Sequence, residues 1–265
     1  MQFVSLNSGS NGNCYYVGND HDAVVVDAGL SCRELLRRMQ QREVDHQRIR
    51  AIFISHEHTD HIKGVDVLSR KLNVPVYITE ATHRSARLTL SPALRRSFQH
   101  NTSVQINSLL VMPFRKAHDA AEPFSFTIQS SDKVVGVFTD IGYVCNELRH
   151  HFSKCHAAFL EANYDDEMLQ NGPYPYYLKK RISGNDGHLS NQQALELFIQ
   201  HRAPHLSHLI LSHLSRENNH PDIVYQLFQQ HAQDTLIHVA SRDEASPVFD
   251  LSGNRQTVVQ THLAL

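Results

Sequence analysis

The chain has 265 residues with 25 Lys or Arg against 27 Asp or Glu, a formal net charge of −2, and a hydrophobic fraction of 41%. This apolar content allows a sizeable buried core and excludes a disordered or fibrous chain. The near-neutral charge excludes bulk attraction to nucleic acid or to an anionic membrane, so such binding requires a local basic patch. The chain contains 20 histidines and no tryptophan. Because histidine is not among the common residues of globular proteins, this count suggests sites that use histidine side chains.

The cysteines and the hydropathy profile indicate the cellular compartment of the protein. Four cysteines lie far apart without a Cys-x-x-Cys pair, which suits neither a disulfide framework nor a thiolate zinc site. We expect Cys14, Cys32, Cys145 and Cys155 to be buried thiols in a reducing compartment. No apolar run approaches the roughly 18 residues of a spanning helix, and the N-terminus lacks a basic and an apolar signal region. We therefore expect a cytoplasmic protein without a membrane partner.

In chain order, strand-like runs come first, at 3–6, 14–17 and 23–26, and a polar turn at 8–13 joins the first two. The turn lacks the Gly-Lys-Ser/Thr ending of a nucleotide-binding P-loop, which favours a plain connection over a ligand-facing loop. A helix is expected after Ser31, with Leu35, Leu36 and Met39 on one side, before a strand at 51–54.

The same alternation continues to the end of the chain. Helices are expected at 65–72, 81–90, 192–200 and 223–231, and strands at 104–106, 109–114, 124–128, 134–138, 157–160, 209–211 and 237–240. Strands and helices intermix, and no Gly/Ser-rich or Pro-rich linker divides the chain. We therefore expect an α/β (α+β) fold of layered sheets and helices, in a single domain over 1–265.

A candidate metal-binding motif follows the strand at 51–54. Residues 55–61 read SHEHTDH, a His-x-His-x-Asp-His pattern. Four nitrogen and oxygen ligands on a loop fixed by a strand can converge on metal, which side chains along one helix or strand face cannot. Imidazole and carboxylate suit zinc, manganese or iron, and the lack of thiolate disfavours a purely structural zinc. The alternative is a solvated, His-rich turn.

This motif, preceded by a strand that ends at Asp27, resembles the metallo-β-lactamase superfamily. Later landmarks of that superfamily follow in order, in the segments KAHD, FTDIG and LSHLS, and supply His118, Asp140 and His213. The resemblance covers the whole chain. It implies the four-layer αββα sandwich of that superfamily.

The resemblance also implies a dinuclear centre with two divalent ions per chain, zinc or manganese, with iron as a further option. His56, His58 and His118 would hold the first ion, Asp60, His61 and His213 the second, and Asp140 would bridge them. Two such cations lower the pKa of a shared water and clamp the attacked oxygen, with Asp60 also counted among the catalytic groups. Asp27 would orient the motif loop by hydrogen bonds without binding metal.

Two further segments resemble the tRNase Z branch of this superfamily. LEAN at 160–163 is similar to its His-Glu-Ala-Thr segment, and GHLS at 187–190 to its downstream His-Ser-Thr segment. In that branch the Glu orients a His that protonates the leaving oxygen of a phosphodiester, which implies these roles for Glu161 and His188. A capping-box pattern at 190–193 opens a helix, so His188 would lie beside free backbone N–H groups. The alternative is a capping histidine without chemistry.

Basic residues gather in two stretches. Between 81 and 118 there is no acidic residue, whereas the basic ones are Arg84, Arg87, Arg95, Arg96, Arg115 and Lys116. Lys179, Lys180 and Arg181 form a second cluster shortly before His188. These stretches are either solvated surface or a track for a polyphosphate backbone, and salt dependence distinguishes the two.

The narrowest resemblance is to the WalJ (YycJ) family of bacterial metallo-hydrolases. It rests on SGSNGN at 8–13, GHLSN at 187–191 and LSHLSRENN at 211–219. That family is associated with 5′-to-3′ exonuclease activity on double-stranded DNA, which implies DNA as substrate, metal-activated hydroxide as nucleophile, and roles near substrate for Ser8, Asn11, Asn13 and Asn191. A long Gly/Pro-rich insertion like the tRNA-clasping arm of tRNase Z is missing, which disfavours a pre-tRNA substrate.

Two other functions stay open. A thioesterase or lactonase of the glyoxalase kind would share the metal ligands but would not need Glu161 and His188. A non-catalytic, metal-binding regulatory protein is disfavoured because all seven ligand positions are present. Nucleophilic hydrolases are disfavoured because the chain has no Gly-x-Ser-x-Gly elbow and no local signature around any cysteine.

Overall fold

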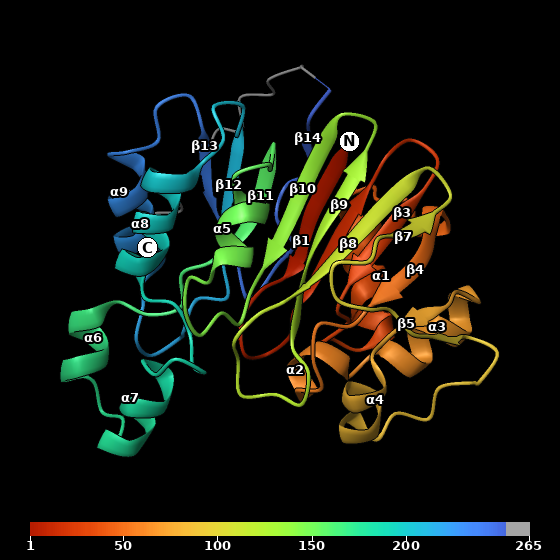
Figure 1. Ribbon diagram of the computed structural model, residues 1–265, viewed down its shortest axis with the longest axis horizontal. Helices are drawn as coiled ribbons and strands as arrows, with labels where there is room; N and C mark the ends of the chain where they lie inside the picture. Colours follow the sequence, from red (N-terminus) through yellow and green to blue (C-terminus); the bar gives the residue numbers. More distant parts are fainter. Residues whose placement is uncertain (253–265) are drawn as a thin grey trace.

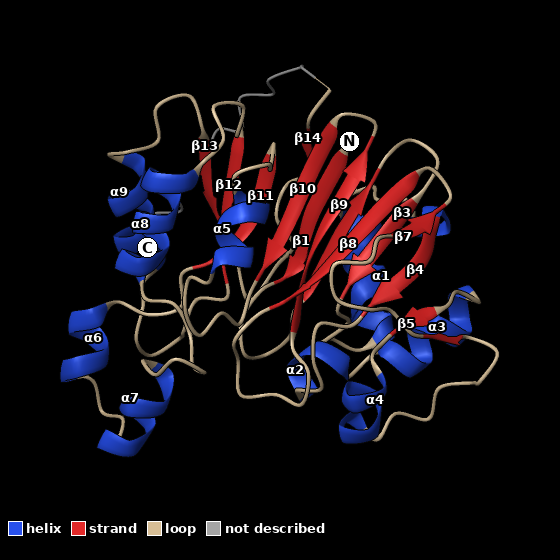
Figure 2. Ribbon diagram, viewed as in Figure 1, coloured by secondary structure: helices blue, strands red, loops and turns tan. Residues whose placement is uncertain are grey.

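The computed structural model describes residues 1–252, and 253–265 lie outside the described residues. Two mixed sheets of seven strands pack face to face, and helices cover their outer faces (Figures 1 and 2). The expected αββα sandwich is therefore confirmed. The single domain over 1–265 stays a prediction, and its last residues fall in the undescribed part.

The first sheet has the strand order β14-β1-β2-β3-β4-β5-β6. Its strands are β1 (Gln2–Asn7), β2 (Cys14–Gly18), β3 (Ala23–Val26), β4 (Ile49–Phe53), β5 (Val76–Tyr77), β6 (Arg95–Arg96) and β14 (Phe249–Asp250). The turn between β1 and β2 and the one between β2 and β3 make antiparallel pairs. From β3 to β6 the strands run parallel, so the loops that follow β3, β4 and β5 begin at the same edge of the sheet.

The second sheet has the order β13-β12-β11-β10-β9-β8-β7. Its strands are β7 (Val104–Ile106), β8 (Leu109–Arg115), β9 (Phe124–Ser130), β10 (Lys133–Phe138), β11 (Ala157–Glu161), β12 (His208–Ser212) and β13 (Leu236–Val239). β10 to β13 pair in parallel and have helices between them in the sequence. β11 and β12 are almost entirely buried, as expected for parallel strands covered on both faces.

Three apolar layers hold the sandwich together. The middle layer lies between the sheets and is rich in aromatic rings, among them Phe3, Phe53, Phe126 and Phe159. Each fully buried ring of this size contributes about 1.5–3 kcal/mol relative to an exposed one. The two outer layers lie under the helices, so every strand face at the centre of the molecule is buried.

Two groups of helices cover the outer faces of the two sheets, and a few short helices lie at the edges of the sandwich (Figure 1). They are α1 (Cys32–Gln41), α2 (Thr59–Ile62), α3 (Val65–Leu72), α4 (Glu80–Ala86), α5 (Asn146–Phe152), α6 (Asp166–Asn171), α7 (Tyr176–Ile182), α8 (Asn191–His201), α9 (Pro221–Gln229) and the short 3-10 helix η1 (His46–Arg48). α1 and α3 contribute to the outer layer of the first sheet, and α5, α8 and α9 to that of the second. Among the described residues, no helix is long and apolar enough to cross a membrane.

Several sequence expectations need correction. The helix expected at 81–90 ends at Ala86, because Arg87 adopts a left-handed backbone with φ 51°. The expected strand at 237–240 lies one residue earlier. All four cysteines are free thiols as expected, but Cys145 is only half-buried, since its sulfur accepts the Leu148 N–H at the start of α5. Short elements such as α2, α5, α6 and α7 were not predicted.

Candidate metal centre

The loops that leave the carboxyl ends of six strands meet at one edge of the sandwich. They carry Asp27 after β3, the motif loop and α2 after β4, His118 after β8, Asp140 after β10, Glu161 as the last residue of β11, and His213 directly after β12. This edge lies at the lower side of Figure 1, around α2. The topology therefore collects side chains that are far apart in the sequence.

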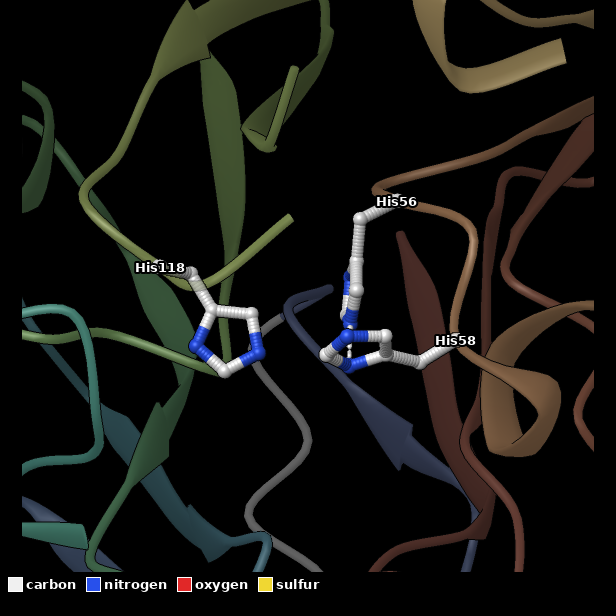
Figure 3. A group of neighbouring side chains, drawn as sticks. All are labelled: His56, His58 and His118. Carbon is white, nitrogen blue, oxygen red and sulfur yellow. Dashed lines mark hydrogen bonds between the residues drawn. The ribbon is translucent and has the colours of Figure 1, made fainter. Parts of the chain in front are cut away.

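One group of candidate ligands consists of three histidines. His56, His58 and His118 each offer a ring nitrogen within 4.8 Å of the others. Figure 3 shows the three rings turned toward one another, two from the motif loop and one from the opposite sheet. His56 Nε2 lies 3.1 Å from His58 Nδ1, marked there by the dashed line. Three converging imidazoles form a nitrogen-rich site of the kind that zinc binds.

A second group consists of Asp60, His61 and His213, again with ligand atoms within 4.8 Å of one another. His61 Nε2 lies 3.5 Å and His213 Nε2 3.9 Å from Asp60 Oδ2. This group combines a carboxylate with two imidazoles, a donor set suited to zinc, manganese or iron.

Asp140 lies between the two groups. One carboxylate oxygen, Oδ2, is 3.3 Å from His61 Nε2. The other, Oδ1, is 3.8 Å from His118 Nε2 and 3.5 Å from His213 Nε2. The side chain is buried and reaches members of both groups.

Unpaired buried atoms at this point show that the residues fit a metal. His118 Nε2, His213 Nε2 and Asp140 Oδ2 are buried and have no hydrogen-bond partner among the described residues. Buried polar atoms in folded proteins nearly always have a partner. These three atoms are all of ligand type and belong to the candidate ligands, so the residues present fit divalent cations.

The pKa shifts divide the centre into two halves. Burial lowers the pKa of His118 to about 4 and that of His56 well below its ordinary value, so both rings are neutral ligands near pH 7. Burial also acts to lower the pKa of His213, but Asp140, Asp60 and Glu161 raise it well above its ordinary value. Without metal, the carboxylate-rich half therefore keeps a proton that a bound cation would replace.

Asp27 organises the motif loop from behind. Its fully buried carboxylate accepts the Ser55 N–H at 2.8 Å and the Ser55 hydroxyl at 2.7 Å, and lies 2.7 Å from His61 Nδ1. The Ser55 hydroxyl in turn lies 2.9 Å from His56 Nδ1. These contacts occupy the Nδ1 atoms, and the Nε2 atoms lie toward other site residues. His56 Nε2 is 3.1 Å from His58 Nδ1, and His61 Nε2 is 3.3 Å from Asp140 Oδ2 and 3.0 Å from the Asn13 amide nitrogen. The structure brings Asp27 into contact with the motif loop, and its orienting role stays a prediction; Ser55 was missed by sequence reasoning.

Glu161 joins two histidines. One oxygen, Oε1, lies 2.8 Å from His188 Nδ1 and 2.9 Å from His213 Nδ1, while Oε2 accepts the N–H of Ile141 at 2.6 Å. Burial opposes its ionisation, but the neighbouring histidines lower its pKa to about 2. The expected pair of Glu161 and His188 is thus brought together, and the contact with His213 is additional.

His188 occupies the rim of the centre. Its side chain is 21% exposed, and its ring centroid is 5.2 Å from that of His118 and 5.3 Å from that of His213. Glu161 occupies Nδ1, while Nε2 has no hydrogen-bond partner in the part of the chain that the structure describes. A partly exposed ring with one nitrogen held and one free can give a proton to a bound molecule.

Three of the four residues expected near substrate are buried and hydrogen-bonded within the protein. The Ser8 hydroxyl accepts the His213 N–H at 2.7 Å, and the buried Asn13 amide donates to Asp60 Oδ2 at 3.2 Å. Asn191 is buried against Asn219, with amide contacts of 3.0 and 2.8 Å. The side chains of these three residues are thus bonded within the protein, and their roles near substrate stay a prediction. Asn11 is exposed and donates to the Arg242 carbonyl.

The basic stretch also needs correction. Lys116 is buried and donates to the Thr139 carbonyl at 2.6 Å, so it cannot belong to a surface track. Arg115 pairs with Glu122 at 2.8 Å, and Arg84 and Arg95 lie 3.6 and 3.7 Å from Glu80. Acidic residues from neighbouring segments therefore offset part of this stretch.

Asp119 is a site residue that sequence reasoning did not select. Its Oδ1 lies 3.4 Å from His118 Nε2, and its Oδ2 accepts the Arg181 Nε–H at 2.8 Å. The only sequence signal was its position directly after His118. Arg181 comes from α7, so this ion pair connects α7 to the centre.

Comparisons with known proteins bear on the family to which the chain belongs. The family model described as "Beta-lactamase superfamily domain" matches residues 22–213. The chain is 32% identical over 263 residues to Exodeoxyribonuclease YycJ of Bacillus anthracis, covering 98% of both chains. It is 31% identical over 264 residues to Exodeoxyribonuclease WalJ of Streptococcus pneumoniae, covering 95% of this chain and 98% of that one.

Solved structures support the fold. The metallo-beta-lactamase fold protein YhfI from Bacillus subtilis superposes with a TM-score of 0.72 at 14% identity, covering 94% of this chain and 100% of that one. Zn(2+)-bound PqqB from Methylobacterium extorquens gives 0.73 at 15% identity, covering 95% and 100%. At these identities the likeness concerns the fold alone. With the family match and the two full-length relatives, it follows that the chain belongs to the metallo-β-lactamase superfamily, as a metal-dependent hydrolase of the WalJ/YycJ type.

Proposed function

We propose that this protein is a dinuclear metal-dependent phosphodiesterase that degrades DNA from the 5′ end. The observation that carries the proposal is the 2.8 Å contact between His188 Nδ1 and the buried Glu161 Oε1, beside the candidate ligands around Asp140. The relatives YycJ and WalJ are named exodeoxyribonucleases, which supports a nucleic acid as substrate. We also propose a cytoplasmic location, supported by the four free thiols.

In this proposal His56, His58 and His118 would hold one divalent ion, zinc or manganese with iron as a further option. Asp60, His61 and His213 would hold the other, and Asp140 would be a shared ligand. When bound, such ions would supply hydroxide at neutral pH and neutralise charge on the attacked phosphate. Asp27 and Ser55 keep the motif loop in the ligand geometry, and Asp60 also orients the attacking water.

His188 acts as the general acid for the leaving 3′ oxygen. It donates the proton from Nε2, while Glu161 holds Nδ1 and fixes the orientation of the ring. Because Glu161 also contacts His213 Nδ1, the same carboxylate aligns the proton donor with a ligand of the second group. The 21% exposure of the His188 side chain is compatible with this role, since a leaving group must reach the ring.

The alternatives explain less of the site. A thioesterase or lactonase would use the same ligands but has no need for the contact between Glu161 and His188. A metal-binding regulatory protein has no need for a partly exposed histidine whose free nitrogen faces the rim. Both remain as outcomes of the following test.

The test offers the purified protein, with Mn²⁺ or Zn²⁺, a 5′-phosphorylated DNA duplex, an RNA, a phosphodiester chromophore, a lactam and a thioester. The duplex is labelled separately on the 5′ and the 3′ end. We expect the 5′ label to be released as small products before the 3′ label is. Hydrolysis of the thioester or lactam alone would overturn the nuclease assignment, and prior loss of the 3′ label would overturn the polarity.

A further inference from the structure

The helices α6 and α7 form an arm, residues 165–187, that projects from the sandwich next to the candidate metal centre (Figure 1, lower left). Tyr176 and Tyr177 at the start of α7 are 79% and 74% exposed. α7 has no buried residue and continues with Lys179, Lys180 and Arg181. The arm therefore presents two aromatic rings and a basic cluster to solvent.

The exposed tyrosines and the basic cluster do not contribute to a buried core of the arm, so folding alone does not account for them. Isolated exposed apolar side chains are common on protein surfaces, but here two tyrosines adjoin three cations within six residues of one helix. Aromatic faces beside a positive track are the features by which proteins hold single-stranded nucleic acid, since every base has a face that can stack. Lys180 has no ion-pair or hydrogen-bond partner among the described residues, so its charge is available.

A groove lies between the two helices. It has a volume of about 540 Å³ and is lined by Tyr164, Leu169, Tyr176, Lys179 and Lys180, together with Asp166, Gln170 and Ser183. Cations and an aromatic ring thus share one concavity, and the single acidic lining residue, Asp166, belongs to the first turn of α6. A base and its phosphate match this lining in size and charge.

The arm is fixed to the centre at both ends. At its start, Tyr164 pairs with Ser190 in a β-bridge, and the Asn163 N–H donates to the Leu189 carbonyl at 2.9 Å. At its end, the His188 N–H donates to the Ile182 carbonyl at 2.8 Å. A strand held on the arm would therefore be held at a defined place relative to His188.

A second tie runs from α7 itself. Arg181 pairs with Asp119, which lies 3.4 Å from His118 Nε2. The segment after α7 also approaches the loop of Asp140 so closely that a Cβ on Gly142 would lie 1.9 Å from the Asn185 carbonyl oxygen. The arm and the centre are thus parts of one packed unit.

We propose that the arm binds an unpaired segment of the DNA strand that is being cleaved. Tyr176 and Tyr177 stack on its bases, and Lys179 and Lys180 contact its phosphates. Bases inside a duplex are already stacked on their neighbours, so exposed rings can reach only bases that have left the duplex. This inference rests on the proposed nuclease function, because the metal centre defines which strand is held.

The first experiment measures binding without catalysis. Full-length protein in EDTA is titrated into a short, fluorescently labelled single-stranded DNA, and anisotropy gives Kd. We expect Tyr176→Ala with Tyr177→Ala to raise Kd about thirtyfold or more, because two base–aromatic stacks are lost. Tyr176→Phe with Tyr177→Phe keeps the rings and should bind like the wild type.

The second experiment measures the charge contribution. Lys179→Ala with Lys180→Ala should reduce the slope of log K against log salt by about 1.4, since each phosphate contact in single strands contributes about 0.7. Arg70→Ala with Lys71→Ala is the matched control, because it removes two exposed cations from α3, far from the arm, and should leave slope and Kd unchanged (Figure 1).

The outcomes separate this inference from the nuclease proposal. Unchanged Kd in the tyrosine variant, or an equal loss of affinity for a blunt duplex and a single strand, would overturn the arm's role. Hydrolysis of a phosphodiester chromophore with Mn²⁺ reports on the metal centre alone and should be the same in all arm variants. Failure of the wild type to cleave either chromophore or DNA would overturn the nuclease function, whereas anisotropy still decides whether the arm binds DNA.

Discussion

Three residues of the centre have an uncommon backbone conformation. Asp27, Asp140 and His213 have φ values of 61°, 54° and 57°. A left-handed conformation at a non-glycine residue costs of the order of 1–3 kcal/mol and is more frequent at functional sites. Each residue comes directly after a strand or within two residues of its end, where the sharp turn directs the side chain back across the sheet edge. The strained backbone conformation therefore occurs at the positions where side chains from different strands converge.

The proton-donor role of His188 can be tested by one substitution. His188→Ala should reduce turnover on DNA by about 10²- to 10⁴-fold, the range of general acid catalysis, because the leaving oxygen loses its donor. Metal content, measured by elemental analysis, should equal that of the wild type. His231→Ala, an exposed histidine after α9, is the control and should retain full turnover. Loss of metal from His188→Ala would show that it is a ligand instead.

Asp27 gives a second prediction at this scale. Asp27→Asn keeps the shape of the side chain but removes the charge that faces Ser55 and His61. We expect metal affinity to fall about 10- to 100-fold, as is usual when a group that orients ligands is changed. Competition with a chelator measures this affinity. An unchanged affinity, with the fold intact, would mean that Asp27 does not organise the loop.

At the level of elements, the strands were easier to predict from sequence than the short helices. β10, β11 and β12 are apolar runs between polar loops, so their existence follows from hydropathy. α7 buries none of its residues and therefore leaves no helical periodicity. In α5, burial of His151 against Phe114, with ring centroids 4.2 Å apart, disguises an otherwise amphipathic pattern.

The start of α8 offers a test of an element that supports the rim. The Ser190 hydroxyl accepts the Gln193 N–H, and the Gln193 side chain accepts the Ser190 N–H, so the expected capping box is present. Ser190→Ala should lower the free energy of unfolding by about 1 kcal/mol in urea titrations. Ser190→Thr can keep the cap and should be close to the wild type. A loss of the same size in both variants would contradict a capping effect.

At the scale of the whole molecule, some site residues could be predicted from local sequence motifs, and others are brought to the site only by the fold. His56, His58, Asp60 and His61 could be predicted as candidate ligands directly, because they lie within six positions of one loop. The contact of Glu161 with His213 spans 52 residues and exists only because β11 and β12 are neighbours. Likewise, nothing local shows that Lys116 is buried while Arg115 beside it is exposed.

A polar contact at the opposite end of the sandwich joins the two sheets. Asp22, before β3, accepts hydrogen bonds from Ser108 and Asn107, before β8, and from Arg50 in β4. Burial acts to raise the pKa of Asp22, but these bonds hold it well below its usual range. Because the folded pKa is depressed, the stabilisation is present above the unfolded value of about 3.9 and is lost as pH falls below it.

Asp22→Asn should therefore lower the free energy of unfolding by about 1–3 kcal/mol at neutral pH, with a smaller difference from the wild type in acid. Urea unfolding of both proteins at about pH 7 and about pH 3 measures this difference. Asp20→Asn, an exposed neighbour in the same turn, should match the wild type at both values. A difference that grows in acid would mean that the folded pKa of Asp22 is not depressed.

The central claim is that the side chains around Asp140 form a two-ion centre for DNA hydrolysis. The most direct measurement removes metal from the protein and then adds Mn²⁺ in steps, while release of label from a 5′-labelled duplex is followed. We predict no cleavage by the metal-free protein and a rise that levels off at two ions per chain. Cleavage that persists without metal, or that never returns while a thioester is hydrolysed, would contradict the claim.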